Sequence, residues 1–258
     1  MARYAAIDCG TNSLRLLISE DNHGRPREIV RLMEIVRLGQ GVDATGEFAP
    51  EALERTRKVL TKYVDLMQQE RVQDVRMVAT SATRDARNKD EFFAMTAELL
   101  GQIRPGACAQ VITGEEEAKL SFIGAVAYLS KEQGPFCVID LGGGSTEFVV
   151  GVAGGQLLGS YSSQMGCVRI SERIMQSDPP TPEEVEAARQ YVAERLAEVQ
   201  EIVPIASAKT FVGCAGTFTT IAALVLGLEK YEPKAIHDCH LRFDGLRALT
   251  RELISITS

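Results

Sequence analysis

Two short stretches of the chain place an aspartate directly before a tight turn of small residues. Asp8 precedes the turn in "DCGTNS", and Asp140 precedes the one in "DLGGGS". Such a turn lets backbone N–H groups converge on an anion without obstruction by Cβ atoms. A carboxylate beside it suits Mg²⁺, whose other ligands are phosphate oxygens and water. The chemistry indicated is phosphate binding by Gly142, Gly143 and Gly144, with Asp8 and Asp140 holding a divalent cation.

A simple tight hairpin would also explain three consecutive glycines. The pattern Asp-x-Gly-x-x-Ser occurs twice, however, when residues 4–19 are aligned with residues 136–151 at an offset of 132, which is the separation of Asp8 and Asp140. Pro50-Glu51 and Pro182-Glu183 repeat at the same offset, and "MVATSAT" repeats as "FVGCAGT" two residues further on. This repetition favours the phosphate site over the bare hairpin.

The repeat predicts two duplicated α/β domains, residues 1–124 and 125–258, that face each other across a cleft. Each half is expected to contain a strand, a tight turn, two further strands, a helix, a fourth strand and a polar loop that opens a helix. The third strands are expected at about 28–38 and 156–164, and the first half should finish with a strand at 109–113 and a helix at 115–129. Thr181 should cap the second-half helix, with Pro182 at its first position and Glu184 at its third.

Two other loops carry residues that suit an anion. The loop at 213–220 offers N–H groups and the Thr217 hydroxyl at a helix start. In its counterpart, residues 80–88, Arg84 lies where a cation opposes the helix dipole, so it either faces an anion or pairs with Asp85 or Glu91. Arg15 alternates with leucines and must point to solvent or into the cleft.

Three consecutive acids open the helix in "TGEEEAKLSF". Capping and the helix dipole suffice to explain at least two of them. A carboxylate at this position could instead accept a proton from water that attacks a bound phosphate. The spacing alone does not say which of the three would do so.

Composition describes an ordinary soluble protein with 45% hydrophobic residues and a formal net charge of −7. This charge argues against nucleic-acid partners and membrane-surface binding. No apolar run reaches the roughly 18 residues of a membrane span, and no signal-peptide core is present at the start, so a cytoplasmic location is expected. The six cysteines are scattered without metal-ligand spacing, and we interpret them as reduced thiols.

Seven segments together closely resemble the exopolyphosphatase and guanosine pentaphosphate phosphohydrolase family, which has the actin, Hsp70 and sugar-kinase (ribonuclease H-like) fold. They cover nearly the whole chain in the family's order: "AAIDCGTNSLRLLI", "RLGQGVDATGEFAPEAL", "ATSATRDARN", "ITGEEEAKLSFIGA", "VIDLGGGSTEFVVG", "SQMGCVRISER" and "CAGTFTTIAAL".

The resemblance implies residue roles. Glu117 would be the general base, with Glu116 preceding it, and Asp140 with Gly142 to Ser145 would handle metal and phosphate. The assisting residues would be Asn12, Ser13, Arg15, Arg84, Gly216 and Thr217, with Arg169 as a further anion contact. Mg²⁺ or another divalent cation would be the cofactor, and a homodimer is a family expectation.

The chain departs from the family in one place. The second half lacks the strand and helix that should close it, so we expect this domain to be truncated. The first expected function is hydrolysis of terminal phosphoanhydride bonds of inorganic polyphosphate. Removal of the 5′-terminal phosphate of guanosine pentaphosphate, a non-catalytic nucleotide or polyphosphate sensor, and a phosphotransferase remain as alternatives.

Overall fold

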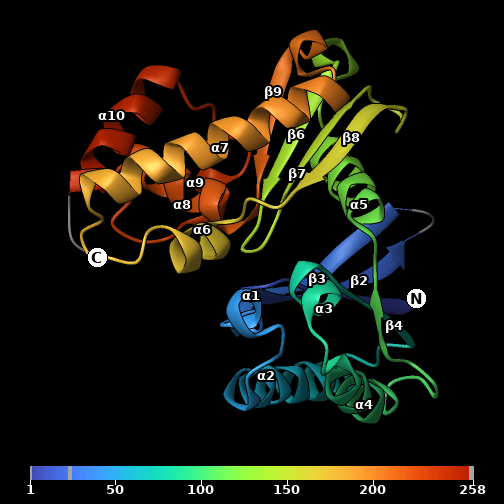
Figure 1. Ribbon diagram of the computed structural model, residues 1–258. Coiled ribbons are helices and arrows are strands. Elements are labelled where there is room, and N and C mark those ends of the chain that lie inside the picture. The colour runs from blue at the N-terminus through green and yellow to red at the C-terminus, as the bar shows by residue number, and fades with distance from the viewer. Residues whose placement is uncertain (1, 23–24, 256–258) are drawn as a thin grey trace. The chain divides into compact units, whose positions relative to one another are not determined.

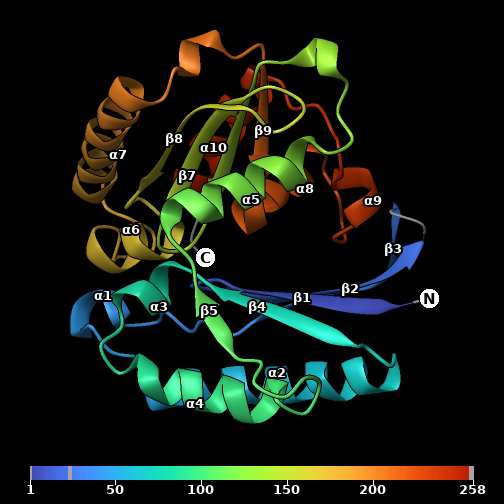
Figure 2. The same ribbon diagram turned by 90° about the vertical axis from the view of Figure 1, so that its right-hand side faces the viewer.

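The computed structural model describes residues 2–22 and 25–255, and these divide between Gly114 and Glu115 into two compact units. Each unit is an α/β assembly built on one mixed sheet (Figures 1 and 2). The boundary lies ten residues before the expected one at 124/125. The reason is the apolar face of helix α5 (Gly114–Val126), whose Ala118, Phe122 and Val126 pack against the second sheet.

The first sheet has five strands in the order β3-β2-β1-β4-β5 within the described residues. Strands β1, β2 and β3 are antiparallel neighbours, and β4 and β5 continue the sheet in parallel. The bounds are β1 Arg3–Cys9, β2 Ser13–Asn22, β3 Arg25–Ile35, β4 Asp74–Ala79 and β5 Ala109–Val111. Strand β3 thus starts and ends about three residues before its predicted limits, and β5 is two residues shorter than predicted.

The first unit's helices are α1 Val42–Thr45, α2 Pro50–Gln69, α3 Ser81–Asp85 and α4 Lys89–Leu100. Helices α2 and α4 lie on the same face of the sheet (Figure 2). Along β1, the buried residues Ala5, Ile7 and Cys9 alternate with more exposed ones, as a sheet with one covered face requires. On α2, Leu60, Val64 and Met67 are almost completely buried in the core against this sheet.

The second sheet has four strands in the order β8-β7-β6-β9 within the described residues. Strands β6, β7 and β8 are antiparallel neighbours, and β9 is parallel to β6. The bounds are β6 Phe136–Leu141, β7 Thr146–Gly151, β8 Leu157–Ser163 and β9 Thr210–Cys214, and short 3₁₀ turns occupy Lys131–Gln133 and Ile205–Ser207.

Helices cover both faces of this sheet, and two separate cores result. Helix α5 packs on Phe136, Val138 and Val149, whereas α7 packs through Val199 on the opposite face of β6 and β7. Strand β7 is therefore buried along its whole length. The second unit's remaining helices are α6 Cys167–Arg173, α7 Pro182–Ile202, α8 Ala215–Val225, α9 Pro233–Ile236 and α10 Phe243–Ser255.

The predicted start of α7 is confirmed. The Thr181 side chain accepts from the Glu184 N–H, the Glu184 side chain accepts from the Thr181 N–H, and Pro182 is the first helical residue. This reciprocal pair satisfies donors that a helix start would otherwise leave without partners. Across the described part of the chain, no helix is both long enough and apolar enough to span a bilayer.

Candidate active site

The β6–β7 hairpin places two carboxylates opposite each other. Asp140 is the last but one residue of β6, and its partner across the antiparallel ladder is Glu147 of β7. The Gly142 N–H donates to the Ser145 carbonyl at 3.0 Å and closes the glycine turn between them. The hairpin register therefore brings two acids together at the end of the sheet where the turn lies.

Glu147 is a buried acid, with only 1% of its surface exposed. Burial raises its pKa to about 8; the nearby charge of Glu117 and, more weakly, that of Asp140 act in the same direction. Hydrogen bonds from Ser162 and Ser145 oppose this rise, and the Ser162 hydroxyl lies 2.7 Å from the Glu147 carboxylate. Glu147 is thus held in place by hydroxyl donors inside a field of negative charge.

Helix α5 brings a third acid to this cluster. Its buried face fixes the helix against the sheet, so that Glu117 and Ser121, one turn apart, share the side toward the hairpin. The Ser121 hydroxyl donates to Asp140 Oδ2 at 2.6 Å. Of the three acids in the first turn, Glu115 is exposed and Glu116 and Glu117 are half-buried. Glu117 is the one whose charge acts on Glu147.

The loop after β9 lies at the same end of the sheet. Because β6 and β9 are parallel and Asp140 is in register with Cys214, their carboxyl ends are adjacent. Ala215 adopts a left-handed conformation with φ 70°, which is unusual for a residue with a Cβ. Gly216 is exposed and Thr217 is half-buried at the start of α8. Gly216 and Thr217, both predicted site residues, thus follow a strand that lies next to β6, the strand that leads into the glycine turn.

The Asp-Gly turn of the first unit has the same hairpin bond but a different partner for its acid. The Gly10 N–H donates to the Ser13 carbonyl at 3.0 Å. Asp8 faces Arg15 across the ladder, with the guanidinium 3.5 Å from the carboxylate. Asn12 and Ser13 are half-buried in the turn.

Arg84 lies in α3, directly after β4, whose carboxyl end is beside that of β1. Its guanidinium donates to the backbone carbonyl of Ile112 at 3.0 Å, and the residue is half-buried. The side chain is therefore tied to the chain that leaves β5. The fold brings Asp8, Arg15 and Arg84 to the same end of the first sheet.

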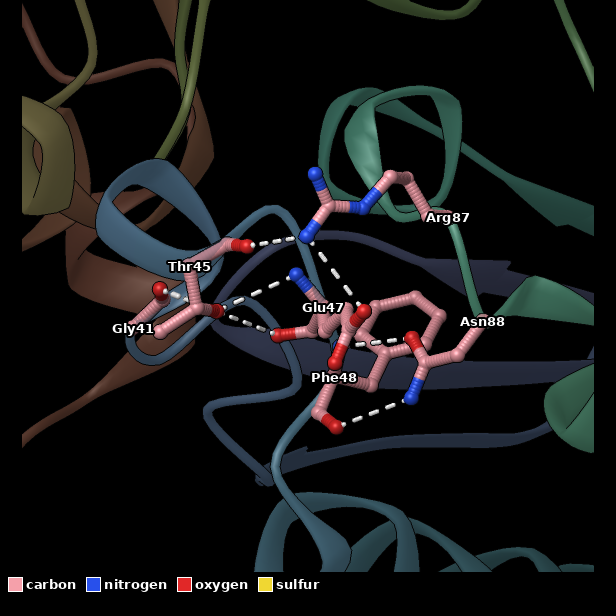
Figure 3. A network of polar contacts seen from close by, with 6 residues as sticks. All are labelled: Gly41, Thr45, Glu47, Phe48, Arg87 and Asn88. Atoms are coloured by element: carbon pink, nitrogen blue, oxygen red, sulfur yellow. Dashed lines mark hydrogen bonds and ion pairs between the residues drawn. The ribbon is translucent and has the colours of Figure 1, made fainter.

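The residues that follow Arg84 hold a neighbouring loop (Figure 3). The Asn88 amide accepts from the Phe48 N–H at 2.8 Å and donates to the Phe48 carbonyl at 3.1 Å. Arg87 donates to the Thr45 carbonyl at 2.9 Å and pairs with Glu47. These contacts fix the loop after α1 to the start of α4, so this part of the segment "TSATRDARN" has a structural role.

A family model described as the Ppx/GppA phosphatase family matches residues 17–258. The chain belongs to the Ppx/GppA phosphatase family. A protein named Exopolyphosphatase 2, from Mycobacterium tuberculosis, is 51% identical over 261 residues, which cover 100% of this chain and 81% of that protein.

Two crystal structures extend this comparison. An exopolyphosphatase-like protein is similar with a TM-score of 0.90 at 38% identity, over 99% of this chain and 79% of that one. An exopolyphosphatase from Cytophaga hutchinsonii gives a TM-score of 0.87 at 27% identity, over 99% of this chain and 80% of that one.

Sequence reasoning missed three residues of this Ppx/GppA site. Glu147 was not predicted, because its place opposite Asp140 depends on the register between β6 and β7. Ser121 could have been found from its spacing of four from Glu117 on a predicted helix. Ser162 had no such signal, since its contact depends on how β8 pairs with β7.

The described residues contain no group of three or more His, Cys, Asp or Glu side chains arranged to hold a metal ion by themselves. The opposed pair Asp140 and Glu147 nevertheless fits Mg²⁺. This ion commonly uses one or two protein carboxylates and completes its shell with water and substrate phosphates. A cation would also offset the burial and the neighbouring negative charge that together raise the pKa of Glu147.

Proposed function

We propose that the chain is an exopolyphosphatase, which releases orthophosphate from the end of inorganic polyphosphate. The family membership and the names of its relatives support a phosphoanhydride hydrolase. The observation that carries the proposal is the acidic cluster of Glu117, Asp140 and Glu147 beside the glycine turn. A binding protein for a polyanion has no use for three clustered carboxylates at the ligand.

We assign the cation to Asp140 and Glu147 rather than to Asp8. The Asp8 carboxylate already has the Arg15 guanidinium beside it at 3.5 Å, so a positive charge faces it without a metal ion. Asp140 faces an acid instead. A bound Mg²⁺ would neutralise charge on the phosphoryl oxygens. Asp8 would then orient Arg15 toward the phosphate chain.

In the proposed reaction Glu117 accepts a proton from water as the water oxygen forms a bond to the terminal phosphorus. The bridging P–O bond breaks in line, its electron pair stays on the shortened polyphosphate, and orthophosphate leaves. The N–H groups of residues 143–145 hold the transferred phosphoryl group. Arg15, Arg84, Asn12, Ser13, Gly216 and Thr217 are the proposed contacts to the rest of the chain, and Glu116 supports the position of Glu117.

The remaining features extend this proposal. The two sheets share the strand order third-second-first-fourth, which supports a duplicated, actin-like architecture. A cytoplasmic location and a homodimer remain expectations, the first from composition and the second from the family resemblance.

The test is phosphate release from long-chain polyphosphate and from guanosine pentaphosphate, measured in parallel with Mg²⁺. Glu117→Gln should lower kcat about 10²–10⁴-fold, as loss of a general base does, with little change in KM. Glu115→Gln is the matched control, because it removes an exposed charge from the same helix turn.

Equal activity of the two variants would reduce Glu117 to a capping charge and overturn the mechanism. A wild type that binds polyphosphate without turnover would be a sensor, and phosphate release that requires ADP would indicate a phosphotransferase. Faster release from guanosine pentaphosphate than from polyphosphate would replace the preferred substrate with the nucleotide.

A further inference from the structure

The start of α6 contacts the glycine turn through the turn's carbonyl groups. The Gly142 carbonyl accepts from the Cys167 N–H at 3.0 Å, and the Gly143 carbonyl accepts from the Arg169 N–H at 3.1 Å. The Gly144 carbonyl accepts from Arg169 Nε at 2.8 Å. Three successive carbonyls of the turn are thus held from one side, two of them by the same residue.

These bonds also fix three N–H groups. In a planar trans peptide the C=O of one residue points opposite to the N–H of the next. Holding the carbonyls of Gly142, Gly143 and Gly144 therefore directs the N–H groups of Gly143, Gly144 and Ser145 away from α6. A set of N–H groups that face the same way is what an anion site needs.

The backbones of α6 and the turn are in close contact, which leaves no room for a side chain at Gly166. A Cβ on Gly166 would lie 2.2 Å from the Gly143 oxygen, well inside contact distance. Only 9% of the surface of Arg169 is exposed, so the bond to Gly144 is shielded from water. The backbone around Gly166 and the side chain of Arg169 together form a rigid back wall for the turn.

The turn of the first unit is held in a related way, but by backbone groups. The Asn12 carbonyl accepts from the N–H groups of Val36 and Arg37, at 3.0 and 2.9 Å, and the Thr11 carbonyl accepts from that of Gly39 at 2.8 Å. In both units the donors lie in the segment after the third strand. Among the bonds named for the two turns, the one from Arg169 Nε to the Gly144 carbonyl is made by a side chain, so a point mutation can break it.

We propose that Arg169 is a positioning residue: its Nε holds the Gly144 carbonyl so that the turn's N–H groups face the terminal phosphate of the substrate. This deepens the proposed function and rests on the phosphate binding at that turn. It replaces direct anion contact as the role of Arg169. The positive charge of the side chain is secondary, and the donor at the Nε position is what the turn requires.

Three variants separate the donor from the charge. Gln places its amide nitrogen at the same position along the side chain as Arg Nε, without a charge. Lys keeps the charge but has a carbon there. Ala removes both. Arg173→Ala, an exposed arginine at the end of the same helix, is the matched control. The first readout is KM and kcat for polyphosphate.

Arg169→Ala and Arg169→Lys should each raise KM for polyphosphate by about tenfold or more, since a buried bond to a charged donor contributes about that factor. Arg169→Gln should remain within about threefold of wild type. A Lys variant close to wild type with a Gln variant as impaired as Ala would overturn the proposal in favour of direct contact with the anion. KM values equal to that of wild type in all three variants would mean that the turn keeps its conformation without Arg169.

A second readout does not depend on turnover. In ¹H–¹⁵N spectra, the amide resonances of residues 143–145 should shift when tripolyphosphate is added to wild type and to Arg169→Gln, and much less in Arg169→Lys. If wild type shows these shifts without hydrolysis, the proposed function fails while the role of Arg169 stands. If wild type hydrolyses polyphosphate and all variants shift alike, the role of Arg169 fails while the proposed function stands.

Discussion

The two Asp-Gly turns share their backbone and differ in the charge that faces the aspartate. In the first unit Asp8 faces Arg15 across the hairpin, and in the second Asp140 faces Glu147. The first pair joins opposite charges, and the second gathers negative charge around the buried carboxyl of Glu147. Under the proposed function, the arginine of the first turn would suit a phosphate group, and the second acid of the other turn would suit a cation.

The largest effect should come from removing the acid that distinguishes the second turn. Glu147→Gln should lower Mg²⁺-dependent phosphate release by at least about 100-fold, because one of two proposed metal ligands is lost. The same change should stabilise the metal-free protein. Activity should fall while stability rises, because a buried charge that serves the proposed function is costly to the fold.

The raised pKa of Glu147 determines how the stability of the protein changes with pH. Burial and the charge of Glu117 raise the pKa of Glu147 to about 8, against 4.5 for the ordinary group. Between these values the folded protein binds more protons than the unfolded chain, so its free energy of unfolding falls as pH rises. In EDTA, Glu147→Gln should unfold at a higher temperature than wild type at pH 8, with the gap closing toward pH 5.

Thermal unfolding in EDTA at a series of pH values measures this gap. Arg15→Gln, at the equivalent position of the first hairpin, should instead lower the unfolding temperature, because it removes the guanidinium beside Asp8. Since that pair is partly exposed, the loss should be under about 1 kcal/mol. A destabilised Glu147→Gln protein at pH 8 would contradict the contrast between the two turns.

A smaller effect is expected from the close contact behind the second turn. Gly166→Ala should cost about 1–3 kcal/mol of unfolding free energy, because the new methyl group meets the Gly143 backbone. Activity should fall with it, as the turn shifts. Gly124→Ala is the control: it lies in α5 with nothing near its Cβ position, and should stabilise by about 0.5–1 kcal/mol.

Urea unfolding and phosphate release on the same samples report both quantities. A Gly166→Ala protein with wild-type stability and activity would show that α6 does not hold the turn. In that case the role proposed for Arg169 would lose its structural basis as well.

A smaller effect than that of Gly166→Ala is expected at Arg55, which holds the loop behind the first turn. Its guanidinium donates to the carbonyls of Val36 at 2.9 Å and Arg37 at 3.3 Å. Arg55→Ala should lower the unfolding free energy by about 1 kcal/mol and raise KM for polyphosphate less than Arg169→Ala does. The reason is that backbone donors still hold the first turn.

Arg57→Ala is the control for Arg55, since it removes an exposed pair with Glu98 from the same helix. It should leave both stability and KM unchanged. If Arg55→Ala raised KM more than Arg169→Ala does, the first turn would be the one that depends more on a side chain.

Sequence signals predicted an element well where it depends on contacts between residues close together in the chain. The capping box at Thr181, the prolines at the helix starts and the two glycine turns all fall where expected. Limits set by pairing were less accurate: β3 starts earlier than predicted, because it follows the register of β2 rather than its own composition.

The site was predicted in part for the same reason. The positions of Asp140, Glu117 and the turn follow from motifs, and the structure places them together in one unit. The partner of each aspartate depends on strand register, and the contact of Ser162 depends on how a third strand pairs. Arg169 was predicted to contact an anion, but a buried guanidinium on a backbone carbonyl cannot be distinguished from that by sequence alone.

The most direct test is to ask which turn holds the cation. Mn²⁺ can be titrated into Asp140→Asn and Asp8→Asn proteins, with tripolyphosphate present and Glu117→Gln included to prevent turnover, and followed by electron paramagnetic resonance. We predict that Asp140→Asn weakens Mn²⁺ binding at least about tenfold, whereas Asp8→Asn leaves it nearly unchanged. Loss of binding in Asp8→Asn with retention in Asp140→Asn would contradict the assignment of the metal to the acidic pair.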